Sequence, residues 1–466
     1  MFELDSFIAK YVTKRSQSMF ITDLEANKEE LTKKISGKSF LVIGGAGSIG
    51  SSFIKAVLPY RPRALVVVDI NENGLAELTR DLRSTKGMYV PKDYVPYPMD
   101  FASPAFEKMF RERKGFDVVA NFSAHKHVRS EKDIYSVEAL IQNNVLHAKH
   151  LLDLLAEYPP EEYFCVSTDK AANPVNIMGA SKRIMEDVIF GYSDKFPVKT
   201  ARFANVAFSN GSLPAGFIAR LQKLQPISAP MDVKRYFVSP EESGQICMLS
   251  CMLGNNREIF FPKLEEAQMM TFDEIARAFL NENGFGVLEC ASDEEAIEKA
   301  AELKEKMSVV GNTISDDKEC ENQQDSGSKD VGRKNHDSMG DEGYGNTTKP
   351  YDLECCNSEL LVKCSDSKYE RLKYPVHFST SNTSGEKSFE EFYTESESVD
   401  MKRFDALGVI VDKPIPDVDE VDAVMQKLDK AFENDDLTKD DVVEIIKEYL
   451  PNFEHIEKGK SLDSKM

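Results

Sequence analysis

The chain has 466 residues, with 58 Lys and Arg against 79 Asp and Glu, so its formal net charge at pH 7 is −21. This length allows about two or three folding units. The net negative charge argues against a protein that coats nucleic acid or a polybasic membrane-surface protein, because clustered Lys and Arg residues bind phosphate-rich partners. No apolar stretch approaches the roughly 20 residues of a membrane helix, so we expect no membrane span and no nucleic-acid partner.

The first 37 residues predict a helical N-terminal extension (1–37), whose charged stretch LEANKEELTKKI ends at Gly37. The start MFELDSFIAKYV carries two acidic residues before its first Lys and lacks the features of a secretory signal. The eight cysteines have no regular spacing, and we expect no metal site. Cys165, Cys247 and Cys251 stand in apolar contexts typical of reduced, buried thiols. We therefore expect a cytoplasmic protein.

Between residues 38 and 209, short β-branched runs alternate with helical segments, which is the pattern of βαβ units and a parallel sheet. In the helix after the first run, Phe53, Ile54 and Val57 share one apolar stripe. We predict a doubly wound α/β domain of the Rossmann type over 38–209. The runs are SFLVIGG (39–45), ALVVVD (64–69), VPYPMD (95–100), FDVVANFS (116–123), YFCVST (163–168) and VKTARF (198–203).

Composition divides the rest of the chain. The alternation loosens over 210–291, which predicts a smaller substrate-binding lobe. Residues 292–368 open with the charged helical run EEAIEKAAELKEKM and continue almost without apolar residues, so we predict a charged insertion with a disordered middle. We predict a return to the substrate lobe over 369–411 and a helical C-terminal tail over 412–466. Apolar residues in the tail follow helical spacing in two groups, which predicts two amphipathic helices. The first group is Val421, Val424, Met425, Leu428 and Phe432, and the second is Val442, Ile445, Ile446 and Tyr449.

The sequence GGAGSIG lies between the first run and the first helix, with Gly44, Gly47 and Gly50 in GxxGxxG spacing. The first two glycines let the backbone turn tightly and approach a pyrophosphate, and the third lets the helix pack on the strand. The helix N-terminus, with Ser48 and Ile49, offers free N–H groups and a partial positive charge. A lone glycine pattern is weak, but this one follows a strand and opens a helix, so it predicts a dinucleotide site.

Two acidic residues end the next two runs. Asp69 is placed to accept hydrogen bonds from the hydroxyls of the adenosine ribose and would repel a 2′-phosphate, which favours NAD over NADP. Arg80 and Arg83 nearby leave NADP as the minority alternative. Asp100 is a candidate for the adenine edge, and it could equally be a turn residue at the strand end.

After the fifth run the chain reads STDKAANPVNIMGASKRIMEDVI (167–189). Residues just beyond the carboxyl ends of strands line the ligand crevice of an open parallel sheet. We therefore expect Thr168, Asp169 and Lys170 to face the bound cofactor. The adjacent carboxylate and ammonium could also be only a surface ion pair.

Four segments together resemble the extended short-chain dehydrogenase/reductase superfamily: GGAGSIG, AHKHV (124–128), STDKAANPVNIMGASK and RFANV (202–206). Within it, the sequence is most similar to the nucleotide-sugar 4,6-dehydratases of polysaccharide biosynthesis, specifically the soluble UDP-N-acetylglucosamine 4,6-dehydratase type. The resemblance covers about 36–285 and resumes at about 372–411 with KYPVHFSTSNTSGEKSFEEFYTE. The ending PNFEHIEKGKSLDSKM is similar to tails of legionaminic-acid pathway members.

The resemblance implies a lyase with an internal redox cycle. NAD takes a hydride from sugar C4, water is lost across C5 and C6, and the hydride returns to C6. The product is a UDP-4-keto-6-deoxy-N-acetylhexosamine, a precursor of surface polysaccharide. By the same analogy, we expect a homo-oligomer whose partner is a small nucleotide-sugar substrate.

The resemblance also suggests catalytic roles. Asp169 would protonate the departing C6 hydroxyl, Lys170 would remove the C5 proton, and Thr168 would hydrogen-bond the 4-hydroxyl. Lys182 matches the lysine that binds the nicotinamide ribose. Met178 stands where the superfamily's YxxxK motif has tyrosine, and a thioether cannot deprotonate the 4-hydroxyl. Either the proton leaves through water, Thr168 or Asp169, or the chain is a dead relative; the intact Thr-Asp-Lys sequence favours activity.

Three further residues are candidates for substrate binding. Lys126 follows the fourth run and can reach a hydroxyl or phosphate, and Asn205 matches an asparagine near the diphosphate. Arg235 could clamp the phosphates through its fork or form a surface ion pair with Glu241 or Glu242. Two other functions stay open: a nucleotide-sugar 4-epimerase, which needs no acid and base for C6, and a non-catalytic cofactor-binding scaffold.

Overall fold

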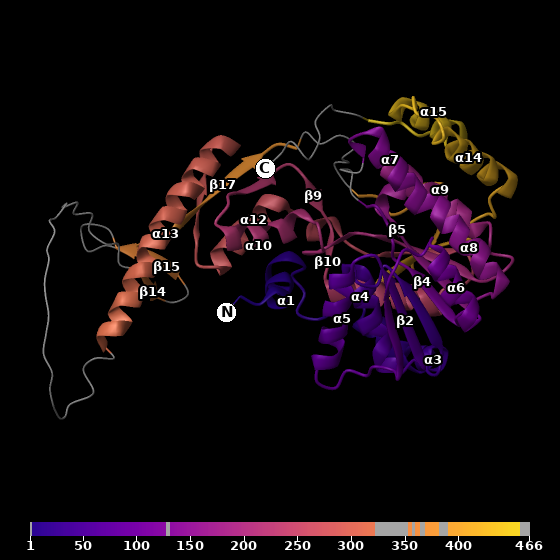
Figure 1. The fold of residues 1–466 in the computed structure, drawn as a ribbon, viewed down its shortest axis with the longest axis horizontal. Helices are drawn as coiled ribbons and strands as arrows, with labels where there is room; N and C mark the ends of the chain where they lie inside the picture. Colours follow the sequence, from indigo (N-terminus) through magenta and orange to yellow (C-terminus); the bar gives the residue numbers. More distant parts are fainter. Residues whose placement is uncertain are drawn as a thin grey trace, which may run out of the picture. The chain divides into compact units, whose positions relative to one another are not determined.

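The six runs predicted as strands lie side by side in one sheet of the computed structural model (Figure 1). The structure describes residues 2–126, 131–321, 353–356, 359–363, 369–381 and 390–456. The pairings among these six strands are all parallel, as the alternation of strands and helices predicts. The strands are β1 (Ser39–Ile43), β2 (Ala64–Asp69), β3 (Asp93–Pro98), β4 (Val118–Asn121), β5 (Glu162–Thr168) and β6 (Val198–Phe203).

The strand order β3-β2-β1-β4-β5-β6 is that of a doubly wound sheet, which confirms the predicted fold class. The chain runs outward from β1 to β3 and then crosses to the other side of β1, where β4 pairs with it. In open parallel sheets, ligands bind beyond the carboxyl ends of the strands at such a reversal. The ends of β1 and β4 are therefore the expected floor of a binding crevice.

Three more strands extend the sheet beyond β6 and come from distant parts of the chain. β11 (Glu258–Pro262) pairs in parallel with β6, and β19 (Leu407–Val411) pairs antiparallel with β11. β18 (Ser398–Asp400) then pairs antiparallel with β19. Every residue of β11 is buried, which is typical of strands covered on both faces. These strands thus belong to the Rossmann sheet, although they lie outside the 38–209 range predicted for it.

Helices cover both faces of the sheet. On one face α11 crosses α4 so closely that a Cβ on Gly244 would lie 2.2 Å from the carbonyl oxygen of Ser52. On the other face α9 packs against α8 and η4. The helices of this part of the chain are α1 (Leu4–Phe7), η1 (Ile8–Val12), α2 (Ile21–Ala26), α3 (Lys28–Ile35), α4 (Ser48–Val57), η2 (Leu58–Tyr60), α5 (Glu72–Ser84), α6 (Pro104–Arg113), α7 (Ile134–Ile141), η4 (Gln142–Leu146), α8 (His147–Glu157), η5 (Asp169–Ala171), α9 (Ile177–Phe190), α11 (Pro240–Leu253), η6 (Glu266–Gln268), α14 (Val418–Ala431) and α15 (Lys439–Tyr449).

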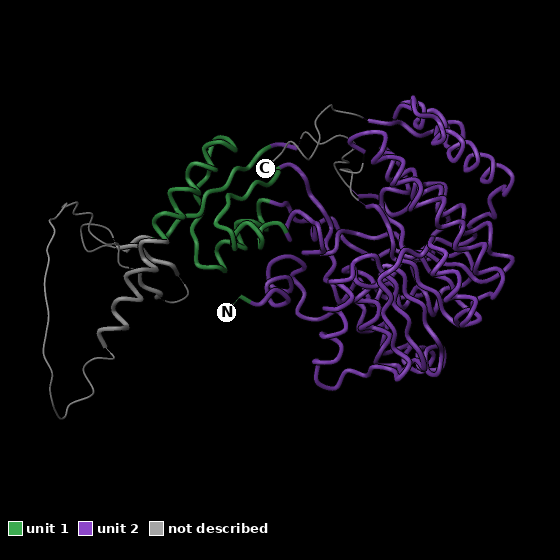
Figure 2. Tube along the Cα trace, in the orientation of Figure 1, with its two compact units in different colours: residues 1–2, 216–231, 273–379 green, residues 3–215, 232–272, 380–466 purple. Residues whose placement is uncertain are grey.

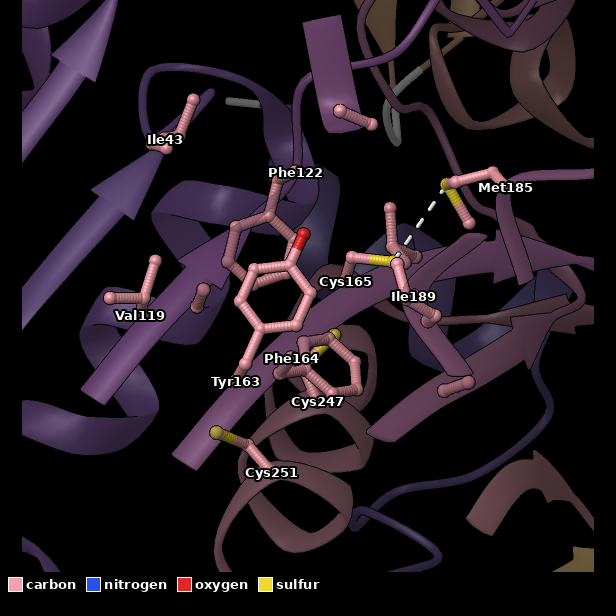
Figure 3. Close-up of a cluster of buried hydrophobic side chains, with 14 of the residues drawn as sticks. Ile43, Val119, Phe122, Tyr163, Phe164, Cys165, Met185, Ile189, Cys247 and Cys251 are labelled. Carbon is pink, nitrogen blue, oxygen red and sulfur yellow. Dashed lines mark hydrogen bonds between the residues drawn. The ribbon is translucent and has the colours of Figure 1, made fainter. Parts of the chain in front are cut away.

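Strand β5 separates the two helical layers of the core, as Figure 3 shows. Side chains alternate along a strand, so Phe164 and Cys165 point to opposite faces. The Phe164 ring lies 6.0 Å from the ring of Phe122, whereas the Cys165 Sγ lies 3.7 Å from the Sδ of Met185 in α9. The prediction of reduced, buried thiols is confirmed for Cys165, Cys247 and Cys251.

The described chain divides into two compact units, coloured separately in Figure 2. The larger unit holds the nine-stranded sheet and two short sheets, β7 with β10 and β9 with β12. The smaller unit, built from 216–231 and 273–379, contains a parallel sheet of order β13-β17-β8. The remaining elements are β7 (Asn205–Val206), α10 (Leu213–Lys223), β8 (Ile227–Pro230), β9 (Lys234–Arg235), β10 (Phe237–Val238), β12 (Met270–Thr271), α12 (Phe272–Glu282), β13 (Gly286–Glu289), α13 (Asp293–Glu321), β14 (Leu353–Cys356), β15 (Glu359–Lys363), β16 (Tyr369–Arg371) and β17 (Lys373–Ser379).

The two units differ from the predicted domain boundaries. Residues 232–272 and 390–411, predicted as substrate lobe, lie in the larger unit, because their strands complete its sheets. The charged run that opens the predicted insertion is helical, as expected, and forms α13. The predicted disorder falls on residues outside the described part of the chain. The assignment of residues 210–291 and 369–411 to substrate binding stays a prediction.

The predicted helical tail is confirmed. α14 lies along α9 and buries Val421, Val424, Met425 and Leu428. The hydroxyl of Thr438 caps α15 by accepting the N–H of Asp441. Among the described residues, no helix has the length and apolar character needed to cross a membrane.

The N-terminal helices are held to the far end of the chain by a buried carboxylate. Asp23 in α2 accepts the main-chain N–H groups of Asp405 and Ala406 at 2.6 and 2.9 Å. These two residues immediately precede β19. The N-terminal extension therefore fixes the entry into the antiparallel strand of the sheet.

Candidate active site

The glycine loop joins β1 to α4, as predicted, and its backbone leaves no room for a side chain at Gly44 or Gly50. Gly44 has a φ of +71°, and a Cβ there would lie 2.7 Å from the backbone of Phe122 and Ser123. A Cβ on Gly50 would lie 2.4 Å from the carbonyl oxygen of Gly44. Gly47 is the N-cap of α4, so the N–H groups of Ser48 and Ile49 stand at the free end of the helix. This is the cradle that a pyrophosphate requires.

A pocket of about 230 Å³ opens beside this loop at the reversal of strand order. It collects residues from the carboxyl ends of the first four strands and from the helices that follow β4. A crevice of this kind, with a glycine cradle on one side and apolar and polar walls on the other, fits a dinucleotide. The lining residues are Ile43, Gly44, Val68, Asp69, Ile70, Met99, Asp100, Phe101, Ser123, His125, Ala139, Gln142, Asn143 and His147.

Asp69 and Asp100 both line this pocket. Asp69 accepts the N–H of Ala46 in the glycine loop at 3.0 Å and that of Asn71 at 2.9 Å, so its carboxylate is fixed in orientation. Asp100 accepts the N–H of Ala102 at 2.8 Å, which is the turn role considered as its alternative. The roles of both residues toward a ribose or an adenine stay predictions.

Thr168, Asp169 and Lys170 form one cluster at the carboxyl end of β5, where Thr168 is the last residue of the strand and the other two begin η5. The Thr168 hydroxyl donates to Asp169 Oδ1 at 2.8 Å, and Lys170 Nζ lies 3.1 Å from the same oxygen. Asp169 is only 4% exposed, so the pair is not the surface ion pair considered as its alternative. The structure thus brings together an acid, an amine and a hydroxyl at one edge of the sheet.

Lys182 and Met178 lie on consecutive turns of α9, and both are buried. Lys182 Nζ donates to the main-chain oxygen of Val166 in β5 at 3.1 Å, and burial lowers the pKa of this lysine. The N–H of Met178 donates to Glu131 Oε1 at 2.9 Å, while Asn176 caps the helix by accepting from Gly179. The first turn of α9 is therefore fixed by two side-chain acceptors.

The predicted substrate residues are placed differently from one another. Lys126 is exposed, next to residues 127–130, which lie outside the described part of the chain and include the second histidine of AHKHV. Asn205 donates from Nδ2 to Glu390 Oε1 at 2.6 Å. Arg235 is buried, so it is not the surface residue of the alternative, and Glu242 is paired with Arg15. The substrate-binding roles of these three residues stay predictions.

Glu390 is a site residue that the sequence reasoning missed. Its Oε1 accepts from Asn205, and its Oε2 accepts the N–H of Tyr236 at 2.8 Å. Burial, followed by the negative charge of Asp169, raises the pKa of Glu390 to about 8. The signal in the sequence was the FEEF stretch in the segment that resembles the family, which marks a polar pair between aromatic residues.

A buried ionic network lies beneath the cluster. Glu186 in α9 accepts from the Ser167 hydroxyl at 2.7 Å and receives two hydrogen bonds from Arg202 of β6. Arg202 also pairs with Glu397, which in turn contacts Lys413. The network thus connects Ser167, which precedes Thr168, to β6 and to the C-terminal part of the larger unit.

The doubly wound sheet, the glycine cradle at its strand reversal and the Thr-Asp-Lys cluster define an α/β protein of the extended short-chain dehydrogenase/reductase type. Within that class, the chain belongs to the polysaccharide biosynthesis protein family, whose model matches residues 40–309, more than half of the chain. The predicted resemblance is confirmed at this level. Its assignment to the legionaminic-acid subgroup stays a prediction.

Three curated relatives show the range of proteins that this chain is similar to. The uncharacterized membrane protein MJ1061 of Methanocaldococcus jannaschii is 29% identical over 253 residues, 53% of this chain and 73% of that protein. The probable polysaccharide biosynthesis protein EpsC of Bacillus subtilis is 27% identical over 262 residues, 55% of this chain but only 42% of that protein. The UDP-N-acetylglucosamine 4,6-dehydratase (inverting) of Campylobacter jejuni is 27% identical over 237 residues, 49% of this chain and 67% of that protein.

Among solved structures, Pen from Bacillus thuringiensis aligns with a TM-score of 0.48 and 20% sequence identity. The alignment covers 56% of this chain and 79% of that one.

Proposed function

We propose that this protein is an NAD-dependent nucleotide-sugar 4,6-dehydratase that acts on UDP-N-acetylglucosamine. The observation that carries the proposal is the buried contact between Asp169 and Lys170 beside the Thr168 hydroxyl. Elimination of water needs one proton donor and one proton acceptor on the same sugar, and the carboxyl of Asp169 and the amine of Lys170 are the two groups of the cluster that can take these roles. Similarity to the Campylobacter jejuni dehydratase supports the same reaction.

The pocket beside the glycine loop supports NAD as the resident cofactor. When bound, NAD would supply the hydride acceptor for C4 and return the hydride to C6. Two carboxylates, Asp69 and Asp100, line the pocket and would repel a 2′-phosphate. Arg80 is paired with Glu77 on the exposed side of α5, which weakens the case for NADP. Lys182 would place its amine beside the nicotinamide ribose.

The hydrogen bond from Thr168 to Asp169 offers a route for the 4-hydroxyl proton in the absence of the usual tyrosine. As C4 is oxidised, the 4-hydroxyl gives its proton to Thr168 Oγ1, and Thr168 passes its own proton to Asp169 Oδ1 over 2.8 Å. This transfer leaves Asp169 protonated. Met178 takes no part in it.

The same proton then serves the elimination. The 4-ketone acidifies the C5 proton, which the neutral amine of Lys170 removes, and the C5–C6 double bond forms as the C6–O bond breaks. Asp169 gives its proton to the departing hydroxyl, so water leaves. The C6 carbon accepts the returning hydride and Lys170 returns a proton to C5, which restores the neutral amine and gives the 4-keto-6-deoxy sugar.

The test is to incubate the purified protein with UDP-N-acetylglucosamine in heavy water without added NAD. We expect a product lighter by one water molecule with deuterium at C5, measured by mass spectrometry and NMR. An unchanged mass with an inverted C4 centre would indicate the 4-epimerase instead. No conversion by protein that carries NAD would favour the non-catalytic scaffold.

A further inference from the structure

The loop over residues 207–212 follows β7 and holds a buried phenylalanine in an unusual backbone conformation. Phe208 has a φ of +54°, in the left-handed region that favours glycine, and Gly211 has a φ of +75°. A bulky side chain enters this region at a cost, so it stays there only where neighbouring contacts hold it. The conformation of this loop is therefore fixed by its contacts with the rest of the larger unit.

The first anchor of the loop is aromatic. The ring of Phe208 packs edge-on against that of Phe7, with ring centroids 5.7 Å apart and an angle of 89° between the ring planes. Phe7 ends α1 in the N-terminal extension and is 2% exposed. In the residue before Phe208, the N–H of Ala207 donates to the carbonyl oxygen of Val238 in β10 at 2.9 Å. The start of the loop is thus held by the N-terminal extension and by β10.

The N-terminal extension is itself bound to the chain around β10. Arg15 donates to the carbonyl oxygen of Phe237 at 3.1 Å and pairs with Glu242 of α11 at 2.7 Å. Glu242 is 1% exposed and also accepts the main-chain N–H of Met19 at 3.1 Å. A buried carboxylate with several hydrogen-bond donors makes a rigid attachment. The ring that supports the loop therefore belongs to a fixed segment.

The second anchor of the loop lies at the candidate dinucleotide site. The N–H of Asn210 donates to the Oγ of Ser48 at 2.8 Å. Ser48 is the first residue of α4, and its own N–H is one of those expected to hold a pyrophosphate. Asn210 and Gly211 are exposed, so this end of the loop adds little to the core. The tip of the loop thus lies against the cradle for a reason other than packing.

We infer that the loop 207–212 is a clasp that slows the release of the cofactor, and that Phe7 is a positioning residue that holds the clasp closed. The inference rests on the proposed NAD site. Opening of the contact between Asn210 and Ser48 precedes release of the cofactor, and Phe7 acts on this contact only through Phe208. A reaction that returns its hydride to the same sugar benefits from a clasp, because the oxidised cofactor is regenerated in place and has no need to leave.

The test measures how fast bound NAD leaves the purified protein, by exchange with an excess of isotopically labelled NAD below the unfolding midpoint. Phe7→Ala removes the ring that supports the loop, and we expect release to become about tenfold faster. Phe7→Leu keeps a large apolar side chain and should give an intermediate rate. Phe196→Ala is the matched control, expected to release NAD at the wild-type rate. Phe196 is 3% exposed, packs edge-on against Tyr163 and precedes β6 at the opposite edge of the sheet.

The contact at the tip is tested with Ser48→Ala, which removes the hydroxyl, keeps the backbone N–H groups and is expected to speed release to a similar extent. If Phe7 acts through this contact, the double variant releases NAD no faster than the faster single variant. Effects that multiply in the double variant would overturn the inference, and so would a wild-type rate in Phe7→Ala. Protein that retains NAD but forms no dehydrated product contradicts only the proposed reaction, whereas a wild type that holds no NAD overturns the clasp as well.

Discussion

Arg202 and Glu186 form a two-point ion pair in which neither side chain is exposed. Arg202 Nε lies 2.9 Å from Glu186 Oε1, and Nη2 lies 2.7 Å from Oε2. Glu186 stands one turn after Lys182 in α9, so the pair fixes the helix that carries this lysine against β6. The geometry of the candidate site thus depends on a buried ion pair between α9 and β6.

Replacing Arg202 by methionine is expected to destabilise the larger unit strongly. The change leaves Glu186 and Glu397 buried without their partner, which costs about 3–5 kcal/mol when one member of a buried pair is removed. The measurement is the midpoint of thermal unfolding. Arg111→Met is the control, because Arg111 pairs with Glu107 and Glu157 at the surface, and its loss should shift the midpoint far less. Equal effects of the two changes would contradict this account.

Glu397 should give the protein a marked sensitivity to acid. Burial opposes its ionisation, yet the hydrogen bond and charge of Arg202 hold its pKa at about 2, below the ordinary 4.5. A lowered folded-state pKa stabilises the fold above pH 4.5, and this contribution is lost as pH falls toward 2. Unfolding midpoints measured between pH 6 and 2 should therefore fall less steeply for Glu397→Gln than for the wild type. Parallel curves would show that this carboxyl is not the acid-sensitive group.

Gly50→Ala is expected to abolish cofactor binding. The added Cβ would meet the carbonyl oxygen of Gly44 at 2.4 Å, so the loop has to shift. The chain contains no Trp, so binding of NAD to cofactor-free protein is best measured by calorimetry. Gly216→Ala is the matched control, since nothing lies within 4 Å of its Cβ position and its backbone is ordinary. Tight NAD binding by Gly50→Ala would contradict the proposed cradle.

Asp169→Asn should impair both halves of the proposed reaction. An amide can neither take the 4-hydroxyl proton from Thr168 nor protonate the C6 hydroxyl, so water loss should slow by about 10²–10⁴-fold without accumulation of reduced nicotinamide. Product mass and nicotinamide absorbance measure the two steps. In Lys170→Met, we expect deuterium exchange at C5 to disappear. A variant of Asp169 that still eliminates water at the wild-type rate would exclude this residue as the acid.

Much of the fold follows from local patterns. The alternation of β-branched runs and apolar stripes predicts β1 to β6 because each run pairs with a strand that follows it closely or shares its βαβ unit. The glycine loop and the Thr-Asp-Lys cluster are predicted for the same reason, since each directly follows a strand. Their positions at the strand ends are confirmed.

The parts that sequence reasoning missed depend on contacts between distant residues. Nothing local marks Leu407–Val411 as a partner of β11, so the sheet was predicted too short. In the same way, Glu390 looks like an ordinary polar residue until Asn205 and Tyr236 are seen to enclose it. Burial of a charged group is set by its partners, and those are supplied by the tertiary fold.

The contacts of Asp23 with Asp405 and Ala406 bear on how the protein is made. A ribosome releases the glycine loop and the first six strands long before it releases β19 and Glu390. An emerging chain can therefore form its nucleotide-binding loop while one edge of the sheet still lacks its neighbouring strand. The carboxylate of Asp23 gains these two hydrogen bonds only when residues more than 380 positions later in the chain have been synthesised. Truncated products would therefore expose an unpaired strand edge, which makes them targets for chaperones and proteases.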